Sequence, residues 1–299
     1  MASAVRHGWR FGTRVTRTFL SNKGVLLAGA VGYNALLSII PLIAITLVVL
    51  SHFWDDETVL RLLVARLRPL APGLAPAAHQ SISSFLANRQ MVGGGGLVML
   101  FLVSSVAFRM LEDAMAIIFR RPRRLRPRSR WVSLLIQFGY VPLVGIGLIL
   151  LTGMSVLAGA LDDGTVLGFR WFAPFAGVLS AALGLTSFVA SVGLLTSFYR
   201  IMPVVKVPVR LAAIGALVAA VLWALVSQGV AYFFDHLSLV PVLYGSLGGV
   251  IVLLVSLEIF SGVLLYSAQI VAEIDRSWRA GRRWWEPAPE APALSLDLS

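Results

Sequence analysis

The chain has 299 residues, of which 58% are hydrophobic and only 13% are charged, against about 25% charged residues in soluble globular proteins. A soluble fold cannot cover its surface with so little charge, so the composition indicates a membrane protein. The net charge of +11 attracts anionic partners, and the absence of cysteine excludes disulfides, thiolate metal sites and cysteine nucleophiles.

Residues 1–24 form a basic segment ahead of the first long apolar run. Val5, Trp9, Gly12 and Phe19 are interleaved with arginines, which fits either a cationic helix at the membrane surface or a solvated basic tail. The apolar run that follows is far longer than the core of a signal peptide, which has about 7 to 15 residues. We therefore expect the run to be retained as a membrane span.

Six apolar runs reach the length of about 20 residues that a helix needs to cross the hydrocarbon core. They cover residues 25–53, 92–119, 131–161, 172–199, 209–234 and 242–272. Pro41 and Pro142 lie inside the first and third runs, where proline removes a backbone donor and kinks a helix. The sequence therefore predicts an all-α membrane domain over residues 25–272, built as a six-helix bundle with kinked helices.

Two further segments flank or interrupt these spans. Residues 54–91 carry leucine and isoleucine at helical spacing, which predicts two short amphipathic helices on the extracytoplasmic side, with the glycines at 93–96 as a hinge. Residues 273–299 are expected to form a cytoplasmic tail. From Glu286 onward this tail is rich in Pro, Ala and Ser, so we expect it to be largely disordered.

Lys and Arg residues are distributed unevenly over the two sides of the expected spans. Nineteen of the 25 lie in segments 1–24, 120–130, 200–210 and 273–299. Five lie in the connections on the opposite side, and Arg109 lies within a span. Because basic loops stay in the cytoplasm, this asymmetry predicts that both termini are cytoplasmic.

Small residues recur at a spacing of four in several spans. Helices in a membrane approach closely where such residues meet, so the repeats predict a compact bundle. The pairs are Ala28 with Gly32, Gly215 with Ala219, Ala216 with Ala220, and Gly245 with Gly249.

Three ionisable residues lie close together on the second span. Arg109 precedes Glu112 by three residues and Asp113 by four, so both carboxylates lie within its reach on one helical face. Ionisable groups are costly in hydrocarbon unless they are paired, which makes them functional candidates. Two interpretations are open: a structural ion pair near the cytoplasmic end, and a substrate-binding or gating site.

Glu258 lies about halfway along the last span, with no basic residue within one turn. Such a carboxylate is either protonated or faces a polar cavity or a cation on another helix, and we expect it to contact Arg109. On the first span, Asn34 and Ser38 lie one turn apart ahead of Pro41. Their side chains are placed to bond carbonyl groups that the proline leaves without a donor. Helix packing is the favoured role of both residues, and substrate contact is the alternative.

Tyr199, Arg200 and Pro203 mark the cytoplasmic boundary after the fourth span. For Arg200, contact with a lipid phosphate or a partner and simple anchoring of the topology are both open. Seven arginines between positions 120 and 130 are expected to attract anionic headgroups. The expected partners are membrane lipids and either an envelope protein or a second copy of the chain, and no nucleic acid.

No pattern of residues indicates an enzyme. The four histidines are scattered without the spacing of a metal site, and the GGGG run lacks the lysine of a phosphate-binding loop. We therefore expect no metal, no cofactor and no catalytic residue. An intramembrane enzyme that uses Glu112, Asp113 or Glu258 is the least favoured of the functions left open.

Three short motifs resemble those of one known family. YNALLSIIPLI at 33–43 resembles the first-span signature of the YihY/BrkB family of bacterial inner-membrane proteins, FYRIMP at 198–203 its turn after the fourth span, and YGSLGG at 244–249 the start of its last span. The resemblance implies six helices, an inner-membrane location and a role in the cell envelope. The last span departs from the family, with SLEIF at 256–260 in place of aromatic residues and SAQ at 267–269 in place of a triplet ending in an acid.

These patterns favour transport or translocation of an amphiphilic or anionic, lipid-like envelope substrate. Arg109 would bind the anionic group, while Glu112, Asp113 and Glu258 would set its charge state. The alternative is a non-catalytic scaffold for an envelope complex, in which the same charges hold the bundle together. The ribonuclease label once given to the family is not supported here, because the cytoplasmic segments are too short to build a site for RNA.

Overall fold

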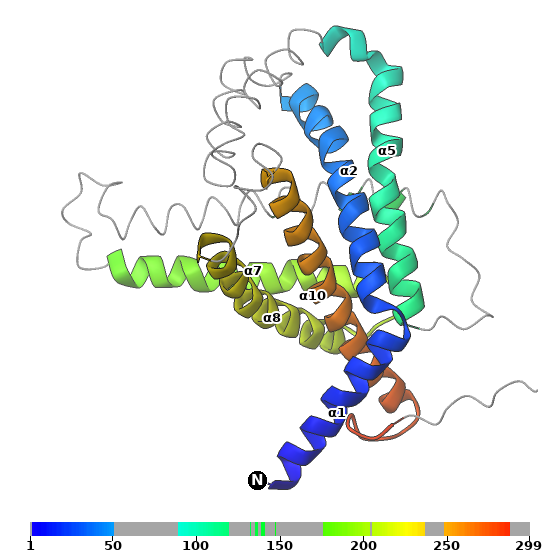
Figure 1. Ribbon diagram of the computed structural model, residues 1–299, viewed down its shortest axis with the longest axis vertical. Helices are drawn as coiled ribbons and strands as arrows, with labels where there is room; N and C mark the ends of the chain where they lie inside the picture. Colours follow the sequence, from blue (N-terminus) through cyan, green and yellow to red (C-terminus); the bar gives the residue numbers. More distant parts are fainter. Residues whose placement is uncertain are drawn as a thin grey trace, which may run out of the picture. The chain divides into compact units, whose positions relative to one another are not determined.

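The computed structural model of the chain describes residues 2–50, 89–119, 132, 135, 136, 139, 140, 147, 176–203, 205–236 and 248–287. Every regular element in these residues is a helix, which confirms the all-α prediction. The described helices are α1 (Ala2–Ser21), α2 (Gly24–Leu50), α5 (Arg89–Ile118), α7 (Ala176–Ile201), α8 (Val209–His236) and α10 (Gly248–Arg279) (Figure 1).

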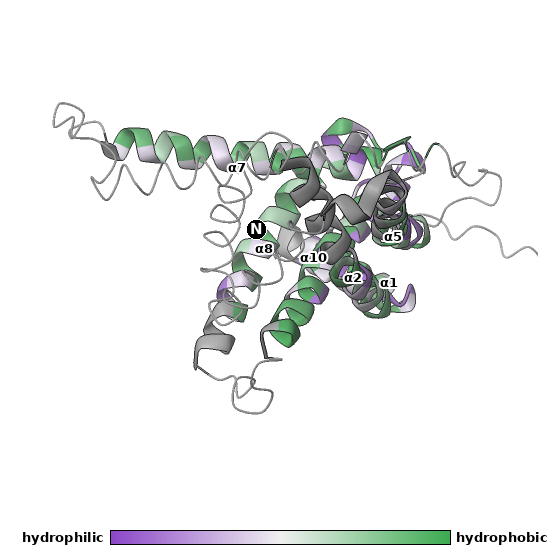
Figure 2. Cartoon of the chain, turned by 90° about the horizontal axis from the view of Figure 1, so that it is seen from above, coloured by the Kyte–Doolittle hydropathy of each residue, from purple (hydrophilic) through white to green (hydrophobic). Residues whose placement is uncertain are grey.

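Five of the expected spans correspond to α2, α5, α7, α8 and α10. The third expected span, including Pro142, lies mostly outside the described residues, and the six residues described within it are all helical. Three described stretches are long and apolar enough to cross a membrane: Gly177–Ile201, Val209–Val230 and Val250–Arg279. Many leucines and valines of α7 are exposed, and Figure 2 shows this hydrophobic character along the helix. Such a surface suits contact with lipid.

Helix α2 continues through Pro41, which lies within the first expected span. Two boundaries differ from the sequence prediction. Helix α5 already begins at Arg89, so the glycines at 93–96 lie inside a helix and do not form a hinge ahead of it. Helix α10 extends beyond Ala272 to Arg279. The amphipathic helices expected over residues 54–88, as well as Gly245, lie outside the described residues.

Specific residues define several helix ends. Pro208 precedes α8, and its carbonyl accepts the backbone N–H groups of Leu211 and Ala212 at 3.0 Å. At the end of α10, Gly281 has a φ of +69°, and the N–H of Arg282 bonds to the carbonyl of Ser277 at 2.9 Å. This is a Schellman motif, in which the left-handed residue is usually glycine. Lys23 takes the same left-handed conformation after α1, with a φ of 57°.

The chain divides into two compact units. The first comprises Met1–Gly24, Met115–Leu222 and Leu264–Ser299, and the second comprises Val25–Ala114 and Trp223–Val263. In the first unit, the fully buried residues include Tyr199 on α7, Leu211 and Ala216 on α8, and Leu265 on α10. A Cβ at Gly215 would meet the side chain of Val271, so this glycine lets α8 approach α10 closely.

Small residues also bring α2 against α10 within the second unit. A Cβ at Gly32 would lie 2.8 Å from the backbone nitrogen of Glu258, and a Cβ at Gly262 would lie 3.8 Å from the Cβ atom of Ala28. Glycine at position 32 is therefore required by the approach of a neighbouring backbone. The pair Ala28 and Gly32 lies at a helix contact, as the spacing of small residues predicts.

Candidate functional site

Glu258 lies on α10 against the small-residue face of α2. Its Oε1 atom would be 3.3 Å from a Cβ at Gly29, and its backbone packs on Gly32. Glu258 is nevertheless an exposed residue. The contact between the two helices thus places the carboxylate of Glu258, on the apolar helix α10, beside the glycines of α2. All of these residues belong to the second unit.

The three ionisable residues of α5 do not form the expected ion pairs. Arg109 and Asp113 are exposed, whereas Glu112 is buried. Among the described residues, Arg109 makes no ion pair with Glu112, Asp113 or Glu258. The expected contact between Glu258 and Arg109 is therefore not formed, because Glu258 packs along α2 and its carboxylate lies beside Gly29.

Asn34 is half-buried on α2 and bonds to its own helix. Its Nδ2 donates to the carbonyl of Ala30 at 2.8 Å, one turn toward the N-terminus. The carbonyl that Pro41 leaves without a helical donor is that of Leu37, four residues before the proline. The bond of Asn34 is thus made one turn before the carbonyl that Pro41 frees.

The boundary residues after α7 fall into two classes. Tyr199 is fully buried, and its hydroxyl donates to the carbonyl of Leu264 on α10 at 3.0 Å. Pro203 is also buried, whereas Arg200 is exposed. Tyr199 and Pro203 therefore serve packing, and only Arg200 has a side chain available to a ligand.

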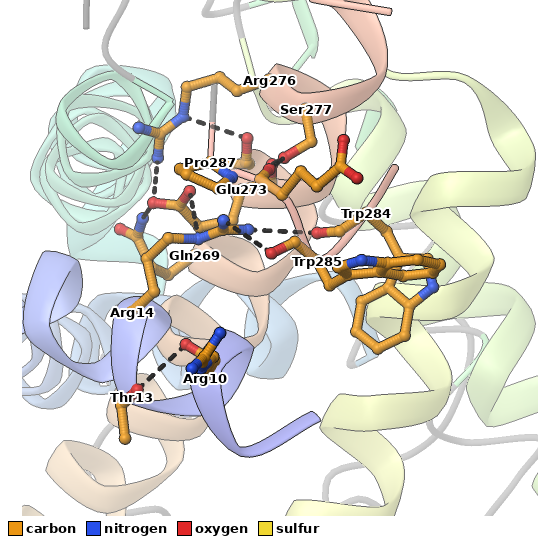
Figure 3. Close-up of polar contacts among 12 residues, drawn as sticks. Arg10, Thr13, Arg14, Gln269, Glu273, Arg276, Ser277, Trp284, Trp285 and Pro287 are labelled. Atoms are coloured by element: carbon orange, nitrogen blue, oxygen red, sulfur yellow. Dashed lines mark hydrogen bonds and ion pairs between the residues drawn. The ribbon is translucent and has the colours of Figure 1, made fainter. Parts of the chain in front are cut away.

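A polar network joins α1 to the C-terminal half of α10 within the first unit (Figure 3). Glu273 is at its centre: its Oε1 accepts from Arg276 Nη2 at 2.8 Å, and its Oε2 lies 3.6 Å from Arg14 Nε. Gln269 donates to the same Oε1 at 3.4 Å and accepts from Asn22 Nδ2 at 3.0 Å. We call Arg14, Asn22, Gln269, Glu273 and Arg276 the Arg14–Glu273 network.

The segment after α10 folds back onto α1 through the same arginine. Arg14 donates through Nη1 to the carbonyl of Trp285 at 3.2 Å and through Nη2 to that of Trp284 at 3.1 Å (Figure 3). The ring of Trp284 meets Phe11 edge-on at 5.2 Å between centroids, and that of Trp285 lies 5.2 Å from His7. Trp284 and Trp285 are thus held against α1. The segment from Glu286 onward that is expected to be disordered lies outside the described residues beyond Pro287.

The electrostatics of this network favour a structural role. Burial lowers the pKa of the Arg14 guanidinium from its ordinary value, and the negative charge of Glu273 opposes this effect. The guanidinium still carries its proton at neutral pH. Two arginines therefore share one buried carboxylate, and the pair with Arg14 holds α1 against α10. Within the described ranges, no group of three or more His, Asp or Glu side chains is placed to hold a metal ion.

Part of this network is indicated in the sequence by the spacing of its charges. Glu273 and Asp275 are each followed within four residues by an arginine on the same helix, a spacing that predicts ion pairs. The second pair, Arg279 with Asp275, is formed at 2.8 Å. The long-range partner Arg14 had no such local signal.

Comparison with known proteins identifies relatives along almost the whole chain. Residues 15–291 match the family described as Virulence factor BrkB. A UPF0761 membrane protein of Tolumonas auensis is 25% identical over 95% of this chain and 91% of its own length. A UPF0761 membrane protein of Aliivibrio salmonicida is 26% identical over 92% and 86%, and one of Aliivibrio fischeri strain MJ11 is 27% identical over 93% and 88%. No solved structure matches the chain.

Proposed function

Because this chain belongs to the Virulence factor BrkB family and its relatives are named membrane proteins, we propose that it translocates an anionic, lipid-like envelope substrate across the bacterial inner membrane. Both termini lie in the cytoplasm in this proposal, as the distribution of basic residues favours. Arg109 binds the anionic group of the substrate. Glu258 lines the polar path along which that group moves.

The exposed carboxylate of Glu258 is the observation that carries this proposal. A carboxyl group on an apolar helix is costly against hydrocarbon, and it is tolerated where it faces water or a polar substrate. Glu258 has exposed surface next to the glycines of α2, and no described cation neutralises it. A bundle that only held other proteins would gain nothing from such a group, since an apolar side chain would stabilise it better.

Reconstitution tests the proposal directly. The protein is placed in liposomes that contain a fluorescent phosphatidylglycerol, and movement of the label between leaflets is measured for the wild type, Arg109→Gln and Glu258→Gln. We expect the wild type to move the lipid and both variants to lose most of that movement. Arg210→Gln is the matched control, because Arg210 is an exposed arginine outside the unit that contains Glu258.

Folding must be checked beside transport. Both site residues are exposed, so their substitution should leave the thermal unfolding temperature within the range of surface changes. Absence of lipid movement by folded wild-type protein would contradict the proposal and favour the scaffold. Equal movement by wild type and both variants would remove Arg109 and Glu258 from the path.

A further inference from the structure

A groove runs along one face of α1, away from the Arg14–Glu273 network. Its volume is about 750 Å³, within the range of about 300 to 1,000 Å³ of small-molecule sites. The residues that line it include Gly8, Trp9, Gly12, Arg17 and Leu20 of α1 and Tyr266 of α10. All of them belong to the first unit.

Two glycines keep the groove open. A Cβ at Gly8 or Gly12 would meet no atom within 4 Å, so neither glycine is required by a neighbouring element. Glycine in a helix costs about 1 kcal/mol relative to alanine, and no packing contact in the described structure offsets that cost here. The empty space above these positions is the space that a ligand would fill.

Aromatic and apolar side chains line the groove, and one of them is fixed in place. Trp9 is 75% exposed and Leu20 is 57% exposed. The Tyr266 hydroxyl lies 2.9 Å from Thr16 Oγ1, and its ring meets Phe19 edge-on at 5.4 Å. From Gly8 to Leu20 the helix rises about 18 Å, close to the half-thickness of about 15 Å of a hydrocarbon core. An acyl chain fits this length and chemistry.

The charge of α1 selects the class of ligand. The helix contains Arg6, Arg10, Arg14 and Arg17 and no acidic residue. Arg17 is exposed at the groove, so it is placed to meet an anionic headgroup. The same charges repel a second α1, which disfavours a helix dimer through the two glycines even though their spacing of four is typical of one.

We propose that the α1 groove binds an anionic phospholipid, with an acyl chain over Gly8 and Gly12 and the phosphate at Arg17. Trp9 lies between the two glycines along α1, so its ring is placed to cover the acyl chain. The site needs no transport to be occupied, so it stands apart from the translocation proposed above. It attaches α1 to the lipid surface.

Photocrosslinking in nanodiscs tests this site. The discs consist of phosphatidylcholine with a trace of phosphatidylglycerol that carries a diazirine in its acyl chain, and labelled peptides are identified by mass spectrometry. We expect label on residues 8–20 and around Tyr266. The double variant Gly8→Leu with Gly12→Leu fills the groove and should abolish this label, whereas Gly184→Leu with Gly193→Leu on α7, where space is also open, should not.

Substitution of Arg17 tests whether the groove recognises the negative charge of the headgroup. Arg17→Gln should lower labelling of α1 about fivefold, and Arg210→Gln should leave it unchanged. Unfolding temperatures of the leucine variants check that the fold persists. Equal labelling of α1 by a phosphatidylcholine probe, unchanged labelling of the filled groove, or crosslinks between two copies of α1 in place of lipid would each overturn the proposal. None of these outcomes depends on lipid movement between leaflets.

Discussion

Gly32 is the residue at which the packing of the second unit is least tolerant of change. Even one added methyl group would meet the backbone of Glu258, which cannot rotate away as a side chain does. We expect Gly32→Ala to lower the free energy of unfolding by about 1 to 3 kcal/mol. Gly184→Ala is the control, because its Cβ meets nothing within 4 Å and should stabilise α7 by up to about 1 kcal/mol. Thermal unfolding in detergent measures both, and equal effects would contradict the close approach.

The Arg14–Glu273 pair is predicted to be cooperative. The Glu273 side chain is only 6% exposed and that of Arg14 is 19% exposed. Removing Glu273 therefore leaves Arg14 without its opposite charge, whereas removing Arg14 leaves Glu273 paired with Arg276. Glu273→Gln alone should cost about 3 kcal/mol. The double variant with Arg14→Gln should cost less than the sum of the two single variants, as measured in a double-mutant cycle. Additive losses would show that the two side chains do not interact.

At the scale of elements, the two left-handed residues at helix ends predict opposite effects. Gly281 after α10 has no Cβ to clash, so Gly281→Ala should destabilise the protein by about 1 kcal/mol. Lys23 after α1 carries a side chain in the same conformation, so Lys23→Gly should stabilise it by a similar amount, less the entropy cost of glycine. Denaturant midpoints measure the two shifts, and shifts of the same sign would argue against this account.

The helices were largely predictable from the sequence, because each apolar run is a local property of its own residues. The runs at 172–199 and 209–234 correspond closely to α7 and α8. The end of α10 was placed too early, since the prediction stopped where the charges begin at Glu273. In the structure those charges are paired with Arg276 and Arg279 on the same helix, so the helix continues.

The contacts between helices were predictable only where small residues marked them. The spacing of Ala28 and Gly32 predicted a close approach, and α10 packs there. The partner of Glu258 could not be read in the same way, because ion pairs between helices depend on their rotation and register. From the sequence, Arg14 contributed only to the predicted orientation in the membrane. Its ion-pair and hydrogen-bond partners could not be predicted, because they lie at least 259 positions further along the chain.

At the scale of the whole molecule, the orientation in the membrane is open to a direct test. The chain has no cysteine, so single cysteines can be introduced without altering the background. Arg89→Cys at the start of α5 and Ala280→Cys after α10 both lie outside the expected spans. If both termini are cytoplasmic, a membrane-impermeant maleimide added to spheroplasts should label Arg89→Cys and spare Ala280→Cys. Labelling of both variants after permeabilisation is the control, and the reverse pattern would invert the topology.

The contacts of α1 also bear on how the protein is assembled during synthesis. Asn22 bonds to Gln269, and Arg14 bonds to the carbonyls of Trp284 and Trp285, 270 or more residues further along the chain. At about 5 to 20 residues per second, roughly 10 to 50 seconds pass before these partners are made. Throughout that interval the earliest helix has no protein surface to complete its fold. A nascent chain that stops short of its last helix therefore exposes Phe19 and leaves Arg14 without its carboxylate partner, whereas both are covered or paired in the finished protein.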